Sequence, residues 1–172
     1  ALEKNLDFLL ETILGMEEQP HLAVVGDGPE RVRLEQLVHA HGGGHHIHFL
    51  GPRQYQQMPD IYAGASVFVT ASRTETHPLT LLEAGCSGLP IVAIDSKATR
   101  GIVSNRVTGL LTLPTATSFT RGVRQLLYRP ALRHRMSQAA QQHAAAQFSV
   151  EASVDRLLDT YSLVRRLQLV EA

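Results

Sequence analysis

Two carboxylates, Glu75 and Glu83, flank seven residues at a predicted junction between a loop and a helix. Upstream, residues 66–70 form a short, mostly apolar and β-branched run, which is typical of a parallel strand buried on both faces. Pro78 supplies the φ angle that the first position of a helix favours. Ligands of open α/β sheets bind outside the carboxyl ends of strands, where N–H groups at a helix start attract phosphate. The two carboxylates therefore predict a site for hydroxyl groups beside a site for phosphate.

A helix and a further strand are expected to follow Pro78. Gly85 is expected to permit close packing, and Gly88 to end the helix before a buried strand at residues 91–94. The lone Cys86 cannot form an internal disulfide, and its small neighbours favour a core filler over a nucleophile. Three residues at helical spacing are expected to form the core face of this helix: Leu79, Leu82 and Cys86.

The rest of the chain alternates between strand and helix patterns. Apolar runs predict strands at residues 22–25 and 47–51. The pattern indicates an α/β fold, with a Rossmann-like, doubly wound parallel sheet flanked by helices. Helices are expected at the start of the chain, over residues 31–40, 54–64, 118–128 and 131–147, and after Ser149, which is suited to cap the last one.

Several segments, taken in order along the chain, resemble the motifs of group 1 retaining glycosyltransferases with the GT-B fold, a family that includes glucosyl- and mannosyltransferases. One motif alone would be weak evidence, whereas the ordered set is specific. The resemblance implies that residues 1–172 form the C-terminal, nucleotide-sugar-binding domain, with an N-terminal acceptor domain upstream. The segments are residues 4–10 (KNLDFLL), 22–31 (LAVVGDGPER), 47–51 (IHFLG), 65–69 (ASVFV), 72–93, 105–111 (NRVTGLL) and 148–151 (FSVE).

The resemblance also implies roles for individual residues. Glu75 would contact hydroxyls of the donor sugar and is the candidate catalytic residue, while Glu83 would contact the ribose of the nucleotide. The N–H groups of Leu79 and Thr80 would face the diphosphate, and Lys4 would counter its charge. The implied nucleotide-sugar site is completed by Gly26, Gly51, Arg53, Thr76 and His77.

One position departs from the family pattern. Many members have glycine three residues after the first glutamate, where this chain has Pro78, which lacks an N–H group. Phosphate binding is then weaker, unless His77 compensates. The triplet Thr74-Glu75-Thr76 is more similar to members that make glycolipids, which hints at a lipid acceptor.

Each of these residues also has a plainer interpretation. Spacing alone favours a solvated loop acid for Glu75 and a helix-surface acid for Glu83, whereas the order of the family motifs favours the binding roles. Asp27 is suited to cap a helix, and Gly26 to turn the chain. Arg53 is equally suited to face solvent.

Five histidines within ten residues invite a metal hypothesis. The first two are two residues apart on a helix and so point to different faces, and the others flank a triglycine with no Cys or acidic residue in the run. We therefore expect no metal and no cofactor. The five are His39, His41, His45, His46 and His48.

Composition is that of a globular domain: 172 residues, 44% hydrophobic and 19% charged. With 16 basic and 16 acidic residues, no overall field attracts nucleic acid or an anionic membrane. No run approaches the roughly 20 apolar residues of a membrane span. A single cysteine fits a reducing compartment, so we expect a cytoplasmic protein, or one peripheral at the inner membrane face.

The resemblance implies a metal-independent hexosyltransferase that retains the configuration of the sugar. The expected partners are a nucleotide-sugar donor, with UDP-glucose the leading choice, the N-terminal domain of the same enzyme, and a lipid or saccharide acceptor. Pro78 leaves a different class open, a non-catalytic Rossmann-like binding or scaffolding module.

Overall fold

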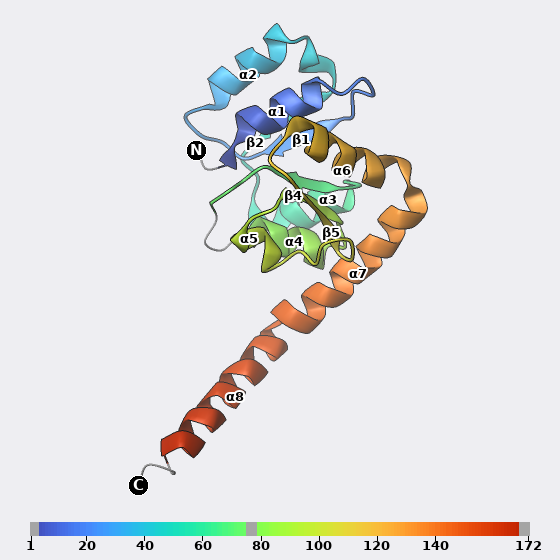
Figure 1. Ribbon diagram of the computed structural model, residues 1–172. Coiled ribbons are helices and arrows are strands. Elements are labelled where there is room, and N and C mark those ends of the chain that lie inside the picture. The colour runs from blue at the N-terminus through green and yellow to red at the C-terminus, as the bar shows by residue number, and fades with distance from the viewer. Residues whose placement is uncertain (1–3, 75–78, 169–172) are drawn as a thin grey trace.

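The computed structural model describes residues 4–74 and 79–168 (Figure 1), and in this part of the chain strands and helices alternate until three consecutive helices follow the last strand. The strands are β1 (Leu22–Val25), β2 (Ile47–Gly51), β3 (Phe68–Thr70), β4 (Ile91–Ile94) and β5 (Gly109–Thr112). The α-helices are α1 (Leu6–Leu14), α2 (Arg31–Ala40), α3 (Met58–Ala63), α4 (Leu79–Cys86), α5 (Lys97–Arg100), α6 (Ala116–Tyr128), α7 (Pro130–Phe148) and α8 (Val150–Gln168). Two 3₁₀ turns, η2 (Gly43–His45) and η3 (Tyr55–Gln57), lie between them.

All strand pairs are parallel, which confirms the α/β class. The ladder is interrupted, however: β1 pairs with β2, and β3, β4 and β5 pair in that order, as two separate sheets. Among the described residues, no strand bonds to both β1 and β3, so the predicted parallel arrangement is divided into two ladders.

One hydrophobic core nevertheless joins the two sheets. It contains residues of β1 and β2 together with residues of β4 and β5, covered by α1 and α6. Phe119 of α6 is fully buried and meets Phe8 of α1 edge-on, with ring centroids 5.8 Å apart. Packing within this shared core fixes the positions of the strands of both sheets, and of their carboxyl ends, relative to one another.

The core face of α4 differs from the expectation. Leu79 is 62% exposed and Cys86 is also exposed, so neither fills the core. The face that packs consists of Leu81, Ala84 and Gly85, and a Cβ at Gly85 would lie 3.8 Å from the Ala144 side chain of α7. The buried face of α4 is the one with small residues, because these let α7 approach closely. Gly88, with φ of 74°, ends the helix as expected.

The segment 54–64 is two elements rather than one helix. Gln54 and Gln57 form a reciprocal capping box around η3, and α3 begins only at Met58. Pro59 lies in the first turn of α3, where its missing N–H costs nothing. The α-helix therefore begins beside the proline rather than at Gln54.

The last helix extends away from the body of the domain, continuing beyond α7 (Figure 1). Ser149 caps it as expected, since its hydroxyl accepts a hydrogen bond from the Ala152 N–H at 3.1 Å. No helix in the described part is long and apolar enough to span a bilayer. Apolar side chains along α8 are about half exposed or more: Val150, Val154, Leu157, Leu158, Tyr161, Leu163 and Val164.

Candidate functional site

The start of α1 is tied to the end of β3. Asn5 adopts a left-handed backbone conformation, and its side-chain amide donates a hydrogen bond to the Ala71 carbonyl at 3.3 Å. Lys4, the predicted diphosphate partner, is exposed directly before this anchor. Two predicted motifs that lie 66 residues apart in the sequence therefore meet in space.

The glycine turns after β1 and β2 also meet. The Gly26 N–H donates to the Gly51 carbonyl at 2.9 Å, and both glycines have positive φ, 122° and 72°. A side chain at Gly51 would crowd the Arg31 guanidinium at 3.1 Å. Arg53 is exposed just beyond this turn.

Asp27 does not cap α2, contrary to one interpretation of its position. Its carboxylate accepts a hydrogen bond from the Gly28 N–H at 2.8 Å and lies 3.8 Å from Arg31. The residue before α2 is Glu30, which makes no side-chain cap. Asp27 instead stabilises the glycine turn itself.

The first two described residues of α4 are exposed. Leu79 and Thr80, whose N–H groups were predicted to face a diphosphate, are both exposed in the first turn of this helix. The first N–H groups of a helix have no partner within it, which makes a helix start suited to bind an anion. Three other predicted site residues lie outside the described part of the chain, namely Glu75, Thr76 and His77, as does Pro78.

Glu83 lies in α4 and is half-buried rather than fully solvated. Its Oε2 accepts a hydrogen bond from the hydroxyl of Tyr62, in α3, at 2.8 Å. Burial, assisted by this bond to a carboxylate, raises the pKa of the Tyr62 hydroxyl above its ordinary value. The hydroxyl therefore remains a donor at any physiological pH.

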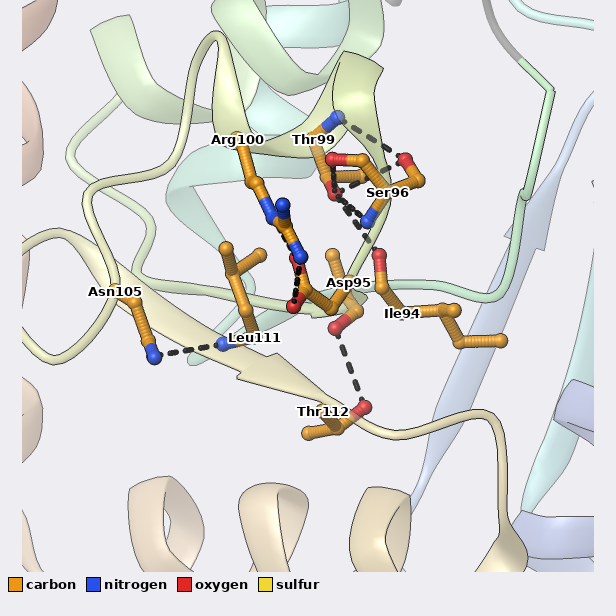
Figure 2. Close-up of polar contacts among 9 residues, drawn as sticks. Ile94, Asp95, Ser96, Thr99, Arg100, Asn105, Leu111 and Thr112 are labelled. Carbon is orange, nitrogen blue, oxygen red and sulfur yellow. Dashed lines mark hydrogen bonds and ion pairs between the residues drawn. The ribbon is translucent and has the colours of Figure 1, made fainter.

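The turn after β4 carries polar residues that the sequence analysis missed (Figure 2). Asp95 follows the strand and binds Arg100 through two hydrogen bonds of 2.6 and 2.8 Å, which holds the pKa of Asp95 below its usual value. Ser96 caps α5 through the Thr99 N–H, and the buried Thr99 hydroxyl donates to the Ile94 carbonyl. The signal available was an acid and a Ser-x-x-Thr pattern directly after a buried strand.

Four of the described histidines approach one another in pairs. His21, from outside the predicted run, stacks on His48 with nitrogens 3.0 Å apart, and His45 approaches His46 at 3.2 Å. Among the residues that the structure describes, no group of three or more histidine, cysteine or acidic side chains is arranged to hold a metal ion. The exposed His39 lies on α2.

The fold matches that of solved glycosyltransferases with the GT-B architecture. A solved structure of HepE from Anabaena, in complex with UDP-glucose, superposes with a TM-score of 0.84 at 22% identity, and covers 94% of this chain and 46% of that chain. The strands and helices of this chain thus correspond to about half of such a fold.

The sequence comparison identifies the family. A model of the family described as Glycosyl transferases group 1 matches residues 1–143, and this chain belongs to that family. Alpha-D-kanosaminyltransferase of Streptomyces kanamyceticus is 28% identical over 165 residues, which are 94% of this chain and 43% of that protein. GDP-mannose-dependent alpha-mannosyltransferase of Mycobacterium tuberculosis is 34% identical over 111 residues, 64% of this chain and 27% of that protein. The chain spans less than half the length of each of these proteins.

Proposed function

We propose that this chain holds a nucleotide-sugar at the carboxyl ends of its strands and serves as the donor half of a retaining hexosyltransferase. UDP-glucose is the proposed donor and a lipid or saccharide the proposed acceptor, bound against an N-terminal domain of the same enzyme. The proposed location is the cytoplasm or the inner face of the membrane. HepE, whose solved complex contains UDP-glucose, supports this choice of donor, while the mannosyltransferase relative makes GDP-mannose the rival.

The observation that carries the proposal is the bond between Asn5 and Ala71. It brings Lys4 to the strand end from which the predicted sugar-binding loop departs. A cation, a helix start at Leu79 and the carboxylate of Glu83 then offer the three kinds of group that a nucleotide-sugar requires.

The proposed chemistry needs no metal. Departure of the nucleoside diphosphate builds negative charge, which N–H groups at the start of α4 and the ammonium of Lys4 are suited to stabilise. Glu75 is the proposed partner of the sugar hydroxyls. As the bond from the sugar to the diphosphate breaks, the acceptor hydroxyl attacks the same face of the sugar and gives its proton to the departing diphosphate, so that the configuration is retained.

A binding or scaffolding module is the second candidate. Pro78 removes one N–H group from the proposed phosphate site, and α8 presents an exposed apolar face suited to protein contact. In such a module, the fold would persist while affinity for nucleotides was lost.

Titration of the isotope-labelled chain separates the two candidates. We expect UDP and UDP-glucose to shift the amide signals of residues 79–83, with a Kd on the order of 0.1 to 1 mM because only one side of the site is present. GDP serves as the matched competitor for the choice of base. If several millimolar UDP leaves these signals in place, the scaffolding interpretation replaces the donor-binding one.

A further inference from the structure

Tyr62 connects two helices that flank the proposed site. Its side chain is 6% exposed and belongs to a hydrophobic cluster with Leu81 and Ala84 of α4. Its ring lies 6.3 Å from that of Phe68 in β3, tilted by 54°. The ring is therefore held in place by packing on two sides, and the position of its hydroxyl is fixed with it.

The hydroxyl of Tyr62 meets the carboxylate of Glu83 in α4. It donates to Glu83 Oε2 at 2.8 Å. Within the described ranges, no lysine, arginine or histidine forms an ion pair with Glu83. A half-buried carboxylate with one neutral donor still has acceptor capacity on its other oxygen.

A purely structural partner for Tyr62 need not be charged. A buried hydroxyl requires one hydrogen-bond partner, which an amide or carbonyl oxygen supplies without the cost of partly desolvating a charge. The presence of a charged residue at Glu83, where an uncharged partner would satisfy Tyr62, is explained if the second carboxylate oxygen binds a ligand. This ligand must offer hydrogen-bond donors, because a carboxylate only accepts.

We propose that Tyr62 is a positioning residue that fixes the Glu83 carboxylate so that Oε1 accepts a hydrogen bond from a ribose hydroxyl of the nucleotide. This inference rests on the proposed function. The bond from Tyr62 occupies Oε2 and restricts rotation of the carboxylate, so that less side-chain entropy is lost when the nucleotide binds. The phosphates of the nucleotide carry no donor for this oxygen, and comparison of ribose with deoxyribose tests the assignment to the sugar.

The test compares UDP with 2′-deoxy-UDP. Its readout of ribose recognition is the Kd of 2′-deoxy-UDP divided by the Kd of UDP. Tyr62→Phe removes one oxygen atom and keeps the packed ring. We expect it to weaken UDP about threefold to tenfold, the range of a hydrogen bond, and to weaken 2′-deoxy-UDP less, so that the ratio falls. Tyr128→Phe, at an exposed position on α6, is the matched control and should change neither value.

A second variant completes a double-mutant cycle. Glu83→Gln keeps an acceptor for Tyr62 but removes the charge, and adding Tyr62→Phe to it should cost little more affinity if the two residues act as one unit. Thermal unfolding of each variant identifies loss of folded protein separately from loss of recognition.

The outcomes distinguish this inference from the proposed function. If wild-type protein does not bind UDP, the proposed function fails. The positioning role is overturned if wild-type protein binds UDP more tightly than 2′-deoxy-UDP and Tyr62→Phe leaves the ratio of Kd values unchanged. It is also overturned if the effects of Tyr62→Phe and Glu83→Gln on affinity add fully. In both cases the proposed donor site stands.

Discussion

At the residue scale, the two predicted glutamates are expected to affect different parts of the ligand. Glu83→Ala should weaken UDP and UDP-glucose alike by about 1–2 kcal/mol, the scale of a charge-assisted hydrogen bond. Glu75→Ala should weaken UDP-glucose and leave UDP nearly unchanged, because UDP has no sugar for it to contact. Calorimetric titration of both ligands measures this. Equal losses of UDP affinity in the two variants would contradict the assignment.

The contact with Tyr62 affects how a Glu83 variant is chosen. Truncation to alanine also removes the acceptor of the buried Tyr62 hydroxyl, a change that itself costs about 1–3 kcal/mol of stability. Glu83→Gln preserves that acceptor, so it is the variant in which a loss of affinity reports on the ligand. Local sequence patterns do not reveal this contact, because the two residues lie 21 positions apart.

The buried side chain of His46 leads us to expect that acid lowers the stability of the domain. It is 2% exposed, its Nε2 has no hydrogen-bond partner among the described residues, and burial together with nearby His45 lowers its pKa. The unfolded chain therefore binds a proton at a higher pH than the folded chain. Stability should fall as the pH drops through the unfolded value of 6.5 toward the lower folded value, and it should recover as the pH rises.

Replacement of His46 by leucine should flatten this part of the pH profile. Leucine cannot titrate, so the loss of stability between about pH 7 and pH 5 should shrink. His39→Leu, at an exposed position on α2, is the control and should leave the slope unchanged. Unfolding midpoints in denaturant at several pH values measure both. An unaltered slope in His46→Leu would assign the acid response to other groups.

At the element scale, Gly109 marks a close approach between strands. A Cβ there would collide with the Ile91 carbonyl oxygen of β4, to which β5 is paired in register. Gly109→Ala should therefore destabilise the domain by about 3 kcal/mol or more, because the clash is with backbone that cannot rotate away. Gly28→Ala, where a Cβ meets nothing within 4 Å, should have a small effect. Chemical denaturation compares them, and equal stability of the two variants would contradict so close a packing of β5 against β4.

The helix α8 is expected to contribute little to the stability of the domain. Its apolar side chains named above are exposed, so Leu158→Ser should change the free energy of unfolding by no more than about 0.5 kcal/mol, while Phe119→Ala in the core should cost about 3–5 kcal/mol. Leu158→Ser should also reduce self-association, since exposed apolar patches promote it. Sedimentation and denaturation test the two effects. A large loss of stability in Leu158→Ser would mean that α8 packs on the domain in solution.

The elements differ in how far the sequence determines them. Strands such as β2 and β4 were predictable because a continuous apolar run has few alternatives in a parallel sheet. The buried face of α4 was not predictable, because leucine, alanine, glycine and cysteine make this helix apolar on more than one side. Its packing depends on Ala144 of α7, far along the chain. The interruption between β1 and β3 also depends on long-range pairing, which local periodicity does not encode.

At the scale of the whole molecule, the residues brought together come from distant parts of the chain. Lys4 reaches the end of β3 through Asn5, and Glu83 meets Tyr62 across two helices. The quoted motifs contained Lys4, Asn5 and Glu83, but they predicted neither Tyr62 nor the contacts between these residues. Residues such as Asp95 and Arg100 were missed because they belong to the turn after β4, outside the quoted motifs.

Turnover is expected to require more than this chain, which alone should neither transfer nor appreciably hydrolyse a nucleotide-sugar. Catalysis requires donor and acceptor to be held in near-attack geometry with water excluded, and such positioning is worth up to about 7–11 kcal/mol of barrier. Incubation with UDP-glucose and lipid or saccharide acceptors, followed by measurement of released UDP, tests the chain directly. A longer protein that adds the proposed N-terminal domain should turn over, and it should do so in EDTA, because the proposed site stabilises the departing diphosphate with N–H groups and Lys4. Steady turnover by the chain alone would place the reacting groups within these residues. Loss of activity in EDTA would instead require a metal, and the histidine pairs would become the first residues to substitute.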